Sequence, residues 1–66
     1  DLDAERERIG KQIAEAEGEV TGLEKKLSNE QFTSRAPAEV VQRERDRLET
    51  TQSRLAGLRQ SLAEIG

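Results

Sequence analysis

Apolar side chains recur in the first part of the chain at alternating steps of four and three residues. The series runs through Leu2, Ile9, Ile13, Ala16, Val20, Leu23 and Leu27, with one gap at Arg6. This is the spacing of the a and d positions of a coiled-coil heptad, which bring a stripe of apolar side chains to one face of a helix. The pattern therefore predicts an amphipathic helix over about residues 2–28.

A second stripe with the same spacing occupies the last part of the chain. It runs through Val41, Leu48, Thr51, Leu55, Leu58, Leu62 and Ile65, with a gap at Glu44. Each stripe persists for more than three heptads, which is long enough to indicate a coiled coil. We expect a second helix over about residues 37–65.

The segment between the stripes favours a turn. Ser28 and Asn29 compete for backbone hydrogen bonds and are more common at helix ends than inside helices. Pro37 lacks an N–H and has φ near the helical value, which suits the first position of a new helix. We expect a loop over about residues 29–36. Because two helices joined by a short connection lie antiparallel, the predicted fold class is all-α, with residues 1–66 forming one arm domain, an antiparallel two-helix coiled-coil hairpin.

The charges beside the stripes indicate how the helices pair. They are mostly acidic on the first helix and basic on the second, so the two helices suit each other as partners. We expect the register that brings Glu17 near Arg45 and Glu19 near Arg47. A register displaced by one heptad ranks second, because it would set Lys26 against Arg47. The favoured register pairs Leu2 with Leu62, Ile9 with Leu55, Ala16 with Leu48, and Leu23 with Val41.

The composition suits long helices and leaves little chemistry for catalysis. Only 32% of residues are hydrophobic and 38% are charged, which together with helical periodicity is typical of a coiled coil. The chain has no histidine and no cysteine, which removes the usual general bases, thiol nucleophiles and most transition-metal sites. We expect no catalytic, cofactor-binding or metal-binding residue in this chain.

Three further expectations concern the setting of the chain. The lack of cysteine fits a cytoplasmic protein, and no apolar run approaches the ~20 residues that span a membrane, so we expect no membrane partner. The chain starts with Asp1 instead of Met, and we interpret it as a segment of a longer protein. Because each helix buries only one stripe, we expect the isolated segment to be marginally stable or to self-associate, for example as a homodimer.

Charge is unevenly distributed along the hairpin. The net charge of −3 argues against a free-standing nucleic-acid binder. Residues 1–24 hold eight acidic and three basic residues, whereas the tip of the hairpin, residues 25–48, holds six basic and four acidic residues. The candidate contacts with nucleic acid are the bases Lys25, Lys26, Arg35, Arg43 and Arg47, and the ring of Phe32. Alternatively, the arginines form salt bridges and Phe32 plugs the gap between the helices.

The tip also carries a motif. The segment Lys26-Leu27-Ser28-Asn29-Glu30-Gln31-Phe32 is followed by Arg35-Ala36-Pro37-Ala38-Glu39-Val40-Val41 and then by Glu44-Arg45. It resembles the C-terminal coiled-coil arm of bacterial-type valyl-tRNA synthetases. In that family the first helix ends in a similar Lys-Leu-Ser-Asn-Glu before a Phe, and an Ala-Pro-x-x-Val-Val start opens the second helix. The resemblance covers essentially the whole chain, and its specific part is the loop motif.

The resemblance implies an accessory tRNA-binding arm of a valine–tRNA ligase, with tRNA-Val as the partner. The longer enzyme would use ATP to activate valine, and the arm would hold the outer corner of the L-shaped tRNA. Leu27, Phe32, Pro37 and Val41 in the motif are expected to shape the loop. The basic tip residues are expected contacts on the ground of their charge and not of the motif.

Two other interpretations stay open. The chain could be a coiled-coil interaction or dimerisation module without a nucleic-acid role. It could also be the C-terminal hairpin of a translation-linked ABC-F ATPase, in which the first helix ends in a similar Leu-Ser-Asp-Pro-x-Phe. Here Asn29 and Glu30 stand in place of the Asp-Pro, and the Ala36-Pro37 continuation fits the synthetase better.

Overall fold

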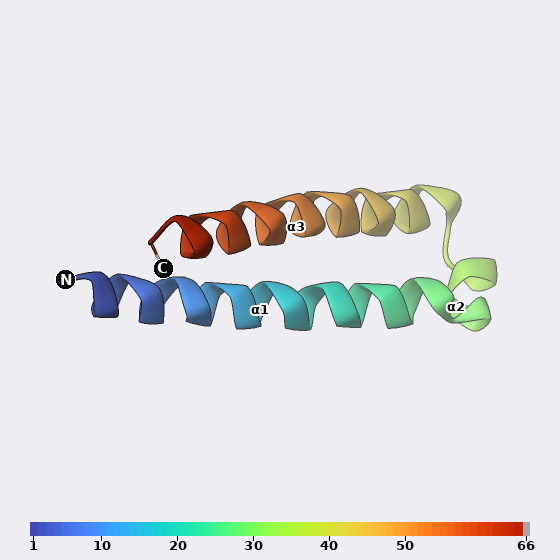
Figure 1. The fold of residues 1–66 in the computed structure, drawn as a ribbon. Helices are drawn as coiled ribbons and strands as arrows, with labels where there is room; N and C mark the ends of the chain where they lie inside the picture. The colour runs from blue at the N-terminus through green and yellow to red at the C-terminus, as the bar shows by residue number, and fades with distance from the viewer. Residues whose placement is uncertain (66) are drawn as a thin grey trace.

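The computed structural model describes residues 1–65, which form a hairpin of two long helices with a short helix at the turn (Figure 1). The helices are α1 (Leu2–Ser28), α2 (Glu30–Arg35) and α3 (Ala38–Ile65). α1 and α3 lie side by side and run in opposite directions, so their outer ends meet at the open end of the hairpin, opposite α2. The described residues contain no strand. The predicted all-α antiparallel hairpin is confirmed.

Local polar contacts set the ends of α1. The carboxylate of Asp1 caps the first turn by accepting a hydrogen bond from the N–H of Asp3 at 3.2 Å. Lys25 and Lys26 occupy the last turn, where positive charge interacts favourably with the helix dipole. Asn29 then leaves the helix with φ −81° and ψ 110°, and donates its N–H to the Lys26 carbonyl. α1 therefore covers the range that its apolar stripe predicts.

The expected loop over residues 29–36 is wrong for most of its length, because α2 occupies it. Asn29 ends α1 and also starts α2, since its side-chain oxygen accepts a hydrogen bond from the N–H of Gln31 at 3.0 Å. One residue with two capping roles allows a helical turn to follow almost directly on another. Ala36 is extended, as residues before a proline usually are, and α3 begins directly after Pro37, one residue later than predicted.

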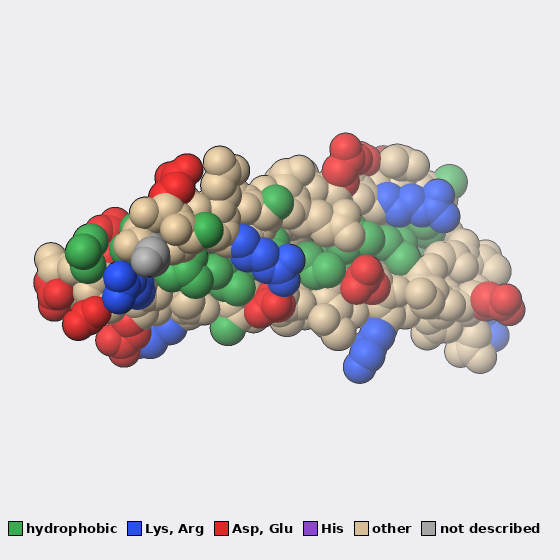
Figure 2. Space-filling model, in the orientation of Figure 1, with side chains coloured by type: hydrophobic (Ala, Val, Ile, Leu, Met, Phe, Trp, Pro, Cys, Tyr) green, Lys and Arg blue, Asp and Glu red, His purple; other side chains and the backbone are tan. Residues whose placement is uncertain are grey.

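The core is the seam between α1 and α3. Figure 2 shows its apolar side chains as a line in the groove between the two helices. The buried residues are Ile9, Ala16, Leu23, Val41, Thr51 and Leu55. All six belong to the predicted stripes, whereas other stripe positions such as Leu58 are only half-buried. A pair of helices can enclose only the centre of its contact face, so the seam leaves an apolar margin on each side.

The predicted register of the two helices is wrong. Glu17 forms an ion pair with Arg59 at 2.9 Å, and not with Arg45. Leu2 was expected to pack on Leu62 but is 59% exposed, because the first turn of α1 extends beyond the end of α3 (Figure 1). The contacts fit the register displaced by one heptad, in which each residue of α1 faces a later residue of α3.

The short helix α2 explains the displacement. α2 follows α1 before the chain turns back, so the chain reverses direction after Arg35 and not at the centre of the expected loop. From the sequence alone the displaced register ranks second, because it would set Lys26 against Arg47. In the structure Lys26 meets Glu44 at 3.4 Å, while Arg47 meets Glu19 at 2.9 Å, the second pair as predicted.

Candidate nucleic-acid interface

Acidic and basic side chains gather at different ends of the arm. Asp and Glu side chains cluster at the open end, at the left of Figure 2. The tip, residues 25–48, contains the end of α1, all of α2 and the start of α3, and it holds six of the eleven basic residues. The candidate contacts predicted from the sequence all belong to this tip, but the structure divides them into two groups.

The first group consists of Lys25, Arg35 and Arg43, which are exposed. Among the described residues, none of them has a carboxylate oxygen within 4.0 Å of its charged nitrogens. Each belongs to a different helix: Lys25 to the last turn of α1, Arg35 to the end of α2, and Arg43 to the second turn of α3. Cations that have no protein partner can neutralise phosphates without first breaking an ion pair.

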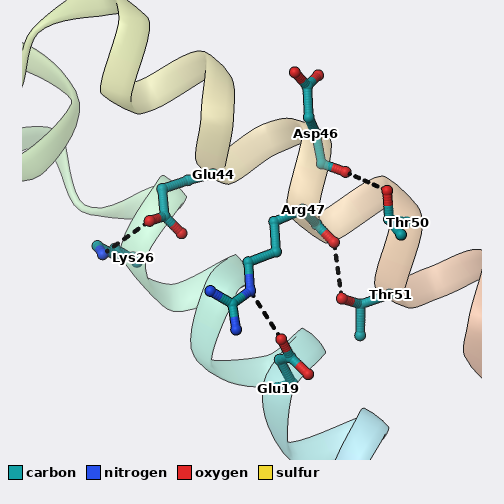
Figure 3. A network of polar contacts seen from close by, with 7 residues as sticks. All are labelled: Glu19, Lys26, Glu44, Asp46, Arg47, Thr50 and Thr51. Atoms are coloured by element: carbon teal, nitrogen blue, oxygen red, sulfur yellow. Dashed lines mark hydrogen bonds and ion pairs between the residues drawn. The ribbon is translucent and has the colours of Figure 1, made fainter.

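The second group, Lys26, Phe32 and Arg47, consists of residues that contact other side chains of the hairpin. The Lys26 ammonium lies over the ring of Phe32, 4.9 Å from its centroid, which is a favourable cation–π distance. The same ammonium is 3.4 Å from a carboxylate oxygen of Glu44 on α3 (Figure 3). Phe32 is half-buried. One face of its ring is therefore occupied by Lys26, and the ring contributes to packing at the tip.

Arg47 is also paired, through its Nε to Glu19 of α1 (Figure 3). The arginine side chain is 65% exposed, and a pair of this kind is worth roughly 0–1 kcal/mol. Arg47 can therefore exchange its carboxylate for a phosphate at small cost. Arg45 was not among the predicted contacts; it is exposed and forms no ion pair in the part of the chain that is described.

The tip bases lie apart from the groove on the surface of the hairpin. A groove of about 430 Å³ lies further along the hairpin, where Val20, Leu55 and Ala56 line it together with the paired Glu17 and Arg59. None of the candidate contacts lines this groove. The basic candidate contacts are instead exposed on the surface of the tip, which suits contact with an extended partner.

Residues 1–65 lack two further kinds of feature, a metal-binding cluster and a membrane-spanning helix. No group of three or more carboxylate, histidine or cysteine side chains lies close enough together to hold a metal ion. None of the described helices is both long and apolar enough to cross a membrane. The expectation that the chain carries no catalytic or cofactor-binding residue stays a prediction.

Comparison with known proteins gives a consistent result. Residues 1–66 match the family described as the valyl tRNA synthetase tRNA binding arm. The chain is 46% identical to a valine–tRNA ligase of Gluconobacter oxydans, 45% to one of Xanthomonas euvesicatoria pv. vesicatoria and 42% to one of Syntrophotalea carbinolica, in each case over 98% of the chain. It spans about 7% of the length of these relatives, and no solved structure matches it. The chain belongs to the family of valyl tRNA synthetase tRNA binding arms.

Proposed function

We propose that the chain is the accessory tRNA-binding arm of a valine–tRNA ligase and helps to position tRNA-Val by its outer corner. The observation that carries the proposal is the family match over residues 1–66, which includes both helices and the tip. Because the chain spans about 7% of its relatives, the ATP-dependent activation of valine and its transfer to tRNA belong to the remainder of the longer, cytoplasmic enzyme. The arm itself contributes binding and no cofactor.

The tip supplies the phosphate contacts in this proposal. Lys25, Arg35 and Arg43 project from three different helices and are free to neutralise phosphates along the backbone of a folded RNA. Double-stranded RNA is recognised mainly by shape and by phosphate and 2′-hydroxyl contacts, which an exposed basic tip can make. Arg47 and Arg45 extend the basic surface along α3. Lys26 and Phe32 contact each other and contribute to the packing of the tip beneath this surface.

The charge of the arm favours binding by the tip and not by the shaft, the paired part of α1 and α3 away from α2. Residues 1–24 carry eight acidic and three basic residues and would repel phosphates, whereas residues 25–48 carry a basic excess. The arm therefore favours an orientation in which only its tip approaches the RNA. An affinity contribution of this kind lowers the KM for tRNA and leaves activation of the amino acid unchanged.

The experiment is carried out in the longer ligase. One variant replaces Lys25, Arg35 and Arg43 by alanine, and a matched control replaces Arg8, Lys11 and Arg54, so both lose three positive charges. Loss of three phosphate contacts is expected to raise the KM for tRNA about tenfold in the tip variant, with valine activation unchanged and the control close to the parent. An equal KM in both variants would refute tip binding and favour an interaction module.

A further inference from the structure

Lys26 connects all three helices at the tip. Its backbone belongs to the last turn of α1, and its ammonium lies 4.9 Å from the centroid of the Phe32 ring in α2. The same group donates a hydrogen bond to Glu44 of α3 at 3.4 Å (Figure 3). The Lys26 ammonium therefore links the Phe32 ring of α2 to the Glu44 carboxylate of α3.

Glu44 occupies a position that hairpin stability alone would give to an apolar residue. It interrupts the stripe between Val41 and Leu48, and its side chain is only 19% exposed. A polar residue at one such position costs stability, and in coiled coils it often specifies how the helices are arranged. The lysine that pairs with it is 46% exposed, so the pair returns little of this cost. The carboxylate therefore has a role other than stabilising the seam.

α2 has few other attachments to the hairpin. None of its residues is buried, and its packing contacts are mainly with α1. It is joined to α1 through Asn29, a single extended residue. Its remaining side-chain hydrogen bonds, from Thr33 and Ser34, are made to backbone oxygens of the same segment and do not orient it against α3.

We infer that Glu44 is a positioning residue for RNA recognition, which holds the Lys26 ammonium over Phe32 and thereby sets the direction in which α2 presents Arg35 to a phosphate. The inference rests on the proposed tRNA-binding function and adds to it an acidic residue that does not touch the RNA. Glu44 acts through Lys26 and Phe32, so its effect is on geometry and not on the charge of the surface.

This role and simple electrostatics lead to opposite expectations for Glu44→Leu. The substitution removes a negative charge from the tip, which by itself would strengthen phosphate binding. It also completes the apolar stripe, which stabilises the hairpin. If Glu44 positions α2, the same variant is more stable than the parent but binds tRNA more weakly, because Arg35 is no longer held in one direction.

The experiment measures tRNA kinetics in the longer ligase carrying Glu44→Leu. Glu39→Gln is the charge-matched control, because Glu39 is an exposed tip residue without contact to Lys26. Thr51→Val is the seam control, because it removes a hydroxyl that bonds only within α3. Loss of one or two oriented phosphate contacts is expected to raise the KM for tRNA about fivefold in Glu44→Leu, while valine activation stays level and neither control raises the KM.

The stability of the same variants is measured by thermal unfolding of the 66-residue chain. Glu44→Leu is expected to raise the Tm by about 5 °C, in the range typical of a 1 kcal/mol change in a chain of this size. A higher Tm with an unchanged or lower KM for tRNA would overturn the inference, as would a lower Tm accompanied by weaker binding. A ligase without the arm is assayed in parallel: an unchanged KM there would instead remove the proposed function.

Nuclear magnetic resonance supplies a signature of the geometry. In the unchanged chain the ring current of Phe32 is expected to shift the side-chain methylene protons of Lys26 upfield, because the ammonium lies over the ring. Glu44→Leu is expected to abolish this shift and to change backbone amide signals only around residues 25–37. Amide changes along the whole α1–α3 seam would indicate an altered register and would overturn the positioning role.

Discussion

Six side chains are buried along the seam between α1 and α3, whereas α2 buries none. The seam is held by the packing of apolar residues from two helices far apart in the sequence, with Leu23 buried on α1 and Leu55 buried on α3. α2 is held by polar contacts that involve few residues: the double cap at Asn29 and the Lys26–Phe32 contact. The difference indicates that the shaft of the arm can be stable while the orientation of its tip is easily altered, which suits a structure that carries a contact surface at its end.

The largest effect is expected from a charge placed in the seam. Leu23→Asp buries a carboxylate without a partner and should cost on the order of 4 kcal/mol, a large share of the ~3–10 kcal/mol expected for a chain of this length. Circular dichroism should show loss of helix in α1 and α3 together. Ala14→Asp, on the exposed face of α1, is the control. Retained helicity in Leu23→Asp would refute the seam.

The next largest effect is expected from a variant that stabilises α1 and α3 without stabilising α2. Gly18 and Gly22 are exposed interior residues of α1, and a Cβ placed at either would meet no atom within 4 Å beyond the neighbouring backbone of its own helix. Replacing both by alanine should stabilise the hairpin by about 2 kcal/mol. Amide hydrogen exchange should slow along α1 and α3 and stay unchanged in α2. Equal slowing of amide exchange in α2 would show that α2 unfolds together with α1 and α3 as one unit.

A complementary variant weakens α2 alone. Asn29→Ala removes the side-chain oxygen that caps α2 and should cost about 1 kcal/mol. Amide exchange at residues 31–35 should then rise about fivefold, the factor that corresponds to this free energy, with α1 and α3 unaffected. Faster exchange throughout the hairpin would contradict the separation between the two regions.

The smallest effect is expected from the exposed charges of the shaft. Glu17 and Arg59 are paired at 2.9 Å, but their side chains are 51% and 57% exposed. A double-mutant cycle with alanine should give a coupling free energy of about 0.5 kcal/mol that falls as salt is added. The same cycle with Glu17 and Arg45 should give no coupling free energy. A measurable coupling between these two residues would support the register expected from the sequence over the observed one.

The sequence was sufficient for the elements of the shaft and insufficient for their pairing. Heptad spacing locates α1 and α3 because it depends only on neighbours within each helix. The register depends on where the chain reverses direction. Asn29 determines this point by capping α2, and the Ser and Thr residues around it are also typical of loops, so the sequence does not reveal the helix. The pairing of Lys26 with Glu44 was missed because flanking charges were compared with each other and not with the polar residue on the stripe.

The candidate site was predicted in its location but not in its organisation. An excess of basic residues around the turn can be counted in the sequence, and Lys25, Arg35 and Arg43 are indeed exposed there. Sequence spacing does not reveal which cations already have partners, because that requires the register. The arrangement of Lys26 and Phe32 in contact with one another, and the free state of Arg45, therefore became evident only in three dimensions.

The hairpin is elongated, with extents of 49 × 14 × 12 Å, so the length of its helices sets the distance between its open end and its tip. Each residue of an α-helix adds 1.5 Å, so adding one heptad to both α1 and α3 would move the tip outward by about 10 Å. A whole heptad also keeps the two stripes facing each other and the tip bases pointing in nearly the same direction. An insertion of three or four residues would instead rotate the tip around the axis. The reach of such an arm can therefore change in steps of a heptad, and the direction of its contact surface is preserved only at those steps.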